Sequence, residues 1–74
     1  MVRTMYIPGY NYWMAESGAY TRSGVDEVAE WCLEHIPRVV YTLDWRGPFV
    51  EPSWWIVCYI ERECDVTLFQ MVWG

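Results

Sequence analysis

The chain has 74 residues, with ten acidic and five basic side chains, so its formal net charge is −5 at pH 7. This acidic balance argues against direct binding of nucleic acid, which needs a basic footprint, and no apolar run approaches the roughly 18 residues that would span a membrane. A chain this short predicts a single domain, residues 1–74, whose core gains density from its six Trp, six Tyr and two Phe side chains.

The first third of the chain combines short β-prone stretches with turn signals. Residues 2–7 predict a first strand, and Pro8-Gly9 predicts the turn that ends it. Residues 10–15 are aromatic and predict a second strand or an extended arm. Residues 16–22 predict a loop that turns at Ser17-Gly18.

The clearest helix signal covers residues 24–35. Ser23, followed three residues later by Asp26, resembles a capping box, and Pro37 ends the helix because the residue before a proline avoids helical geometry. A period of 3.6 residues places six small or apolar side chains on one side of this helix. We expect that face to pack on a sheet: Val25, Val28, Ala29, Cys32, Leu33 and Ile36.

The second half of the chain contains the stretch around which we expect the fold to form. Residues 54–60 are seven apolar side chains in a row, and we place them in a central strand because such a strand would aggregate at a sheet edge. Residues 38–45 alternate in polarity and predict a neighbouring strand, residues 46–52 connect the two, and residues 65–73 predict a last strand. The predicted order is β(β)αβββ. This is a two-layer α+β sandwich with a mainly antiparallel sheet of three to five strands, a C-terminal β-meander and one helix packed on one face.

The three cysteines favour reduced thiols and a cytoplasmic protein, because an odd count fits poorly with a disulfide framework. Cys32 and His35 lie one turn apart, so a Cys–His enzyme is an alternative. Together with Cys58 and Cys64 they supply zinc-ligand types, although their spacing matches no common structural zinc pattern. We expect no catalytic residue, no metal and no cofactor, and keep a small Cys/His enzyme or metal-binding domain as the alternative.

The outer face of the predicted helix carries an unusual row of acids. Asp26, Glu27, Glu30 and Glu34 fall within an arc of about 100°, and Trp31 flanks that arc. Like charges four residues apart cost about 0.2–0.5 kcal/mol per pair in an isolated helix, and no base falls inside the predicted helix to neutralise them. These five residues are therefore the predicted partner-binding site. The competing explanation is a solvated face that only keeps the protein soluble.

These features predict a non-enzymatic interaction protein that binds the basic surface of another protein. The most specific form is an inhibitor whose carboxylates stand in for phosphates and block the nucleic-acid-binding site of a protein or complex. In size, acidity and architecture the chain resembles the small acidic proteins that phages use against host defences, including anti-CRISPR proteins, although no residues match. A structural homo-oligomer packed through its aromatic rings, in its simplest form a homodimer, is a further alternative.

Overall fold

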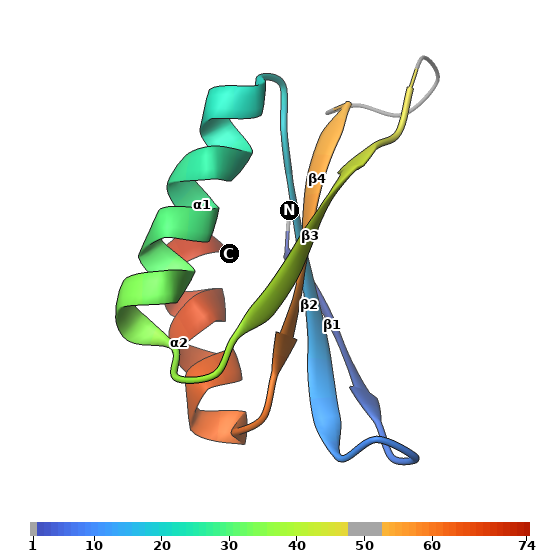
Figure 1. The fold of residues 1–74 in the computed structure, drawn as a ribbon, viewed down its shortest axis with the longest axis vertical. Coiled ribbons are helices and arrows are strands. Elements are labelled where there is room, and N and C mark those ends of the chain that lie inside the picture. The colour runs from blue at the N-terminus through green and yellow to red at the C-terminus, as the bar shows by residue number, and fades with distance from the viewer. Residues whose placement is uncertain (1, 48–52) are drawn as a thin grey trace.

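The computed structural model describes residues 2–47 and 53–74 and shows a two-layer α+β fold (Figure 1). A four-stranded antiparallel sheet has the strand order β1-β2-β4-β3, and both helices lie on the same face of it. The two-layer architecture predicted from the sequence is confirmed, with the order ββαββα. The elements are β1 (Val2–Ile7), β2 (Tyr12–Ala19), α1 (Arg22–His35), β3 (Val40–Trp45), β4 (Trp54–Ile60) and α2 (Glu63–Trp73). Residues 48–52, predicted as part of the connection before β4, lie outside the described residues.

Strand β4 is the centre of the sheet, as its uninterrupted apolar sequence predicted. It pairs with β2 on one side and β3 on the other. Alternate residues face the helices, and Ile56, Cys58 and Ile60 are completely buried there. Val57 is also buried although it faces the opposite side of the sheet, so β4 is enclosed on both faces for part of its length.

Strand β2 is longer than predicted and continues through Ser17 and Gly18, so the predicted loop at residues 16–22 is wrong. Its pairing with β4 extends from Trp13 to Ala19. Small side chains are needed at this end because the first turn of α1 packs closely on it. A Cβ added to Gly24 would lie only 2.7 Å from the Ala19 Cβ. The close approach of α1 to the end of β2 therefore depends on small residues at Ala19 and Gly24.

Helix α1 begins two residues earlier than predicted, and the expected Ser23 capping box with Asp26 does not form. The N-cap is Thr21, whose backbone is extended and whose Oγ1 accepts a hydrogen bond from the Gly24 N–H at 3.2 Å. Ser23 lies within the first turn, with its Oγ 3.1 Å from the Thr21 Oγ1. The helix ends at His35, before Pro37, as the sequence predicted.

A pair of matched substitutions tests which residue caps α1. Thr21→Ala removes the acceptor for the Gly24 N–H and should lower the free energy of unfolding by about 1 kcal/mol. Ser23→Ala removes only an exposed hydroxyl and should change it by less than about 0.5 kcal/mol. Urea unfolding followed by tryptophan fluorescence measures both. The opposite ranking would assign the cap to Ser23.

The last segment is helix α2, so the predicted strand at residues 65–73 and the C-terminal β-meander are wrong. Val66, Phe69 and Trp73 follow a helical spacing of three and four residues and lie on the inner side of α2. Acids in the first turn suit a helix N-terminus, and Asp65 also receives two hydrogen bonds from the Arg62 guanidinium, at 2.8 and 3.2 Å. The β-prone composition is overridden because α2 packs over the β1 and β2 side of the sheet.

The presence of α2 also changes which side of α1 is buried. Five of the six residues predicted to face the sheet are buried, but Leu33 is 61% exposed. Trp31, on the other side of the helix, is half-buried against Phe69 and Trp73 of α2. Because α1 packs against both the sheet and a second helix, its buried arc extends toward Trp31 and leaves Leu33 in solvent.

Candidate functional site

The acidic row predicted from the sequence borders a shallow groove between the two helices. The groove has a volume of about 310 Å³ and is lined by Glu27, Glu30, Trp31 and Glu34 of α1 and by Trp73 of α2. We call it the acidic groove. The structure thus brings together four of the five predicted partner-binding residues, with a second indole that the sequence analysis did not include.

Trp31 is held in place on several sides. The His35 ring stacks on it at a centroid distance of 4.8 Å and an interplanar angle of 20°, and His35 Nδ1 lies 3.0 Å from the Trp31 carbonyl oxygen. Phe69 and Trp73 meet the Trp31 ring edge-to-face at 6.2 and 6.1 Å. A ring fixed by three aromatic neighbours loses little conformational entropy when a partner contacts it.

Asp26 differs from the other predicted acids because it forms an ion pair with an arginine of its own helix. Helix α1 begins at Arg22, whose Nε lies 3.3 Å from the Asp26 Oδ1, so the expectation that the helix contains no base is wrong. Asp26 is exposed and does not line the groove. The arginine fell outside the predicted helix only because the cap was placed at Ser23.

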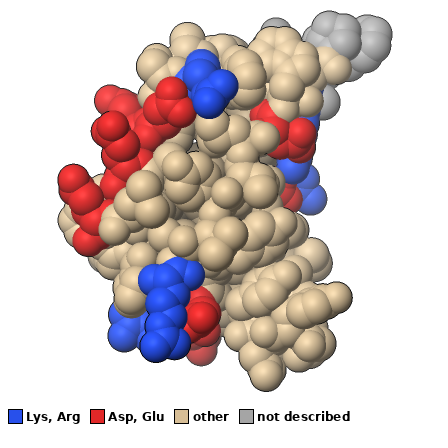
Figure 2. All heavy atoms as spheres, in the orientation of Figure 1, with Lys and Arg blue, Asp and Glu red and all other residues tan. Residues whose placement is uncertain are grey.

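Among the described residues, the acids without an ion pair are concentrated at the acidic groove. Within residues 2–47 and 53–74, five acids form ion pairs with arginine: Glu16, Asp26, Asp44, Glu61 and Asp65. Four described acids form none: Glu27, Glu30, Glu34 and Glu63. Three of these four line the groove, and acidic side chains gather along the outer side of α1 in Figure 2. No described arginine therefore pairs with the acids that line the groove.

Trp73 is the groove residue that the sequence analysis missed. It was assigned to a strand, where it could not be placed against α1. Its seven-residue separation from Val66, with Phe69 between them, was the available signal for a shared helix face. The Trp73 Nε1 is buried and has no hydrogen-bond acceptor among the described residues.

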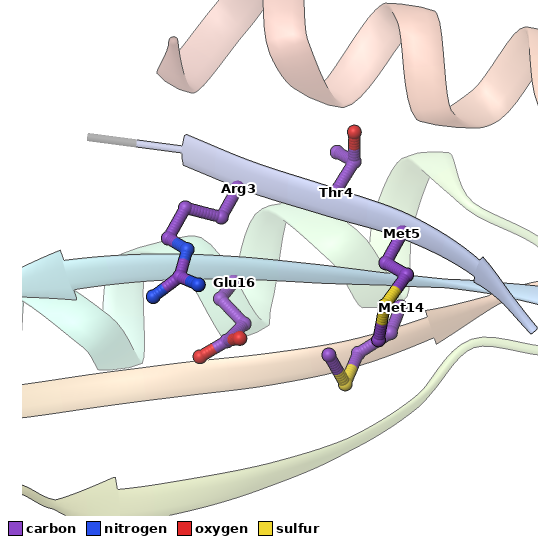
Figure 3. A pocket seen from close by; sticks show the side chains of 5 residues that line it. All are labelled: Arg3, Thr4, Met5, Met14 and Glu16. Carbon is purple, nitrogen blue, oxygen red and sulfur yellow. The ribbon is translucent and has the colours of Figure 1, made fainter.

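A second pocket lies on the opposite face of the sheet and has a different character (Figure 3). It measures about 180 Å³. The side chains of Met5 and Met14 point into it, while Thr4 points toward α2. Glu16 also lines it, but the Arg46 Nη2 lies 2.6 Å from the Glu16 Oε2. The buried carboxylate of this pocket is already paired, unlike those of the acidic groove.

The residues considered for Cys/His chemistry are not brought together. Cys32 is buried and lies 3.8 Å, sulfur to sulfur, from Cys58, while His35 is exposed and stacks on Trp31. Cys64 is exposed at the start of α2. In the described part of the chain, no group of three or more His, Cys, Asp or Glu residues is arranged to hold a metal ion. No helix within the same residues is long and apolar enough to cross a membrane.

The acidic groove has the chemistry of a cation-binding surface. Carboxylates accept charge-assisted hydrogen bonds from guanidinium and ammonium groups, and indole faces attract the same cations. Its volume falls at the lower end of the range for small-ligand sites, which suits one long side chain better than a whole cofactor.

A scan against protein-family models finds no match to the chain, and neither does a search of curated proteins or of solved structures.

Proposed function

We propose that this protein is a small non-enzymatic interaction protein that binds a basic surface of another protein through the acidic groove. Its most specific form is an inhibitor of a nucleic-acid-binding protein or complex, in which carboxylates occupy the positions of phosphates. One observation carries the proposal: three of the four described acids without an ion pair line one groove, beside two indole rings.

The spacing of the acids supports the comparison with a phosphate backbone. Glu27 and Glu34 lie seven positions apart on α1, with Glu30 between them, so the three acids extend along about 10 Å of helix axis. One strand of DNA carries a charge about every 3.4 Å along its axis, so a similar length holds three or four phosphates. A surface that binds phosphates through arginine and lysine would therefore meet a comparable density of charge here.

The two tryptophans add what a row of acids alone lacks. Trp31 and Trp73 offer apolar and π surface next to the carboxylates, so an arginine side chain from the partner can pair with an acid while its guanidinium lies on a ring. Tryptophan and arginine are also the residue types most enriched among binding hot spots. We therefore expect the two indole rings to contribute most of the binding free energy, and the groove carboxylates to raise the association rate by attracting the basic partner.

The proposal places the protein in the cytoplasm, where nucleic-acid-binding machinery is abundant. All three cysteines are free, and two of them are buried, which is compatible with a reducing compartment.

The test compares two triple variants that carry the same net charge. Glu27→Gln, Glu30→Gln and Glu34→Gln together change the formal charge from −5 to −2. The matched control, Asp44→Asn, Glu61→Gln and Glu63→Gln, changes it equally at acids outside the groove. Proteins captured from a host lysate at low salt are identified, purified and measured for association rate at several salt concentrations. The groove variant should associate about tenfold more slowly or worse, and its rate should depend less on salt.

Two further arms decide between binding at the groove and general electrostatic attraction. Trp31→Ala should speed dissociation more than it slows association. The nucleic acid of the captured protein should compete with the wild-type chain for binding. If the two triple variants behave alike, or nucleic acid does not compete, the phosphate-mimic proposal is wrong.

A further inference from the structure

The buried pair Cys32 and Cys58 is the feature that the proposed function leaves unexplained. Cys32 lies on the inner face of α1, Cys58 lies on the central strand β4, and their sulfur atoms are 3.8 Å apart. Both side chains are completely buried in the core. The pair is the point at which the helix that carries the acidic groove meets the middle of the sheet.

We propose that Cys32 and Cys58 are a site of reversible oxidation that fastens α1 to β4 through a disulfide bond. The bond would close a loop between residues 26 positions apart, joining the two layers of the fold. The inference stands independently of the groove's partner.

The two sulfur atoms already lie in contact in the folded chain. A disulfide needs its sulfurs at about 2.05 Å, so the two atoms must approach by less than 2 Å from their present contact. The fold already brings the two residues together, and the entropic cost of closing the loop is therefore met by folding. By reciprocity, a bond that forms more readily in the folded chain must stabilise that chain.

The chemistry requires an oxidant, for which oxidised glutathione is the simplest class. Cys32 and Cys58 each lose a thiol proton, one S–S bond forms between them, and the S–S bond of glutathione breaks. Two electrons and two protons pass to glutathione, which leaves as two thiol molecules. The exposed Cys64 has no described cysteine in contact and takes no part.

Burial determines how fast the reaction proceeds. The hydrogen bond with Cys32, together with burial, raises the pKa of the Cys58 thiol well above its ordinary value. Because both residues are completely buried, glutathione has little access to either sulfur in the folded protein, and oxidation of the folded protein should be slow. Refolding in a glutathione buffer avoids this barrier, since both thiols are then accessible before the core closes.

The experiment uses the full chain with Cys64→Ser, which leaves only the proposed pair. The protein is refolded in mixtures of reduced and oxidised glutathione, and peptide mapping without reductant measures the fraction in which residues 32 and 58 are linked. We expect the equilibrium constant for the bond to be at least about tenfold larger than for the same chain in 6 M guanidinium chloride. The linked protein should melt at least about 10 °C above the reduced protein.

Comparison of the linked and reduced forms of one protein keeps the test independent of any variant that fails to fold. Cys58→Ala in the same background should show no rise in Tm after oxidation. The inference is overturned if the bond forms no more readily than in guanidinium chloride. It is equally overturned if the linked protein melts at or below the temperature of the reduced one, or if glutathione stays attached as a mixed disulfide.

Discussion

Replacing Ile56 with alanine is expected to lower the free energy of unfolding by about 2–5 kcal/mol, the range for removing a large aliphatic side chain from a core. Ile56 is completely buried at the centre of the sheet, where its register neighbours are Ser17 on β2 and Leu43 on β3. A 74-residue domain typically has only about 4–11 kcal/mol of total stability. The substitution should therefore leave the protein partly unfolded near 37 °C.

Val40→Ala is the matched control, because it also removes methyl groups from a strand but at a site that is 62% exposed. It should change the free energy of unfolding by less than about 0.5 kcal/mol. Urea unfolding at 25 °C measures both variants. If Ile56→Ala unfolded at the same urea concentration as the control, the result would contradict the central, buried position of β4.

The parts of the fold that the sequence predicted are those with strong local signals. Residues 54–60 could only be a central strand, since their unbroken apolar run needs partners on both sides. Pro8-Gly9 marked the turn between β1 and β2, and Pro37 marked the end of α1. In each case a short stretch has one physically reasonable structure, whatever the rest of the chain does.

The parts that were mispredicted depend on packing between distant segments. The residues of α2 are rich in β-prone types, so their local sequence favours a strand. They form a helix because α2 packs on the part of the sheet, around β1 and β2, that α1 does not cover. Leu33 was expected in the core because one helix on a sheet has one buried face, whereas α1 has two neighbours. The strand predicted for residues 65–73 also kept Trp73 out of the candidate site, whereas the α1 periodicity alone predicted that Glu27, Glu30 and Glu34 share one face.

The substitution Phe69→Ala tests the unexpected helix and its connection with the acidic groove. Phe69 is completely buried and meets the Trp31 ring edge-to-face at 6.2 Å. Its removal should cost about 3–5 kcal/mol, the range for truncating a large aromatic side chain in a core. Met71→Ala is the control, because Met71 is 78% exposed on the same helix and its truncation should cost little.

This pair of substitutions separates the two structures considered for residues 65–73. In a strand, Phe69 and Met71 would share one face and have similar burial, because side chains alternate with a period of two. In α2 they differ completely, so urea unfolding should show a large loss for one and almost none for the other. Equal losses would contradict the helix.

Phe69→Leu extends the test to the groove while retaining most of the buried volume. It should cost less stability than Phe69→Ala, yet it removes the aromatic contact that helps to fix Trp31. We expect a weaker near-ultraviolet circular dichroism signal from tryptophan and faster dissociation of the captured partner, with an unchanged association rate. The association rate should stay the same because the acids that attract the partner are unchanged. A change in the association rate would contradict the role assigned to Phe69, which is only to hold the Trp31 ring in place.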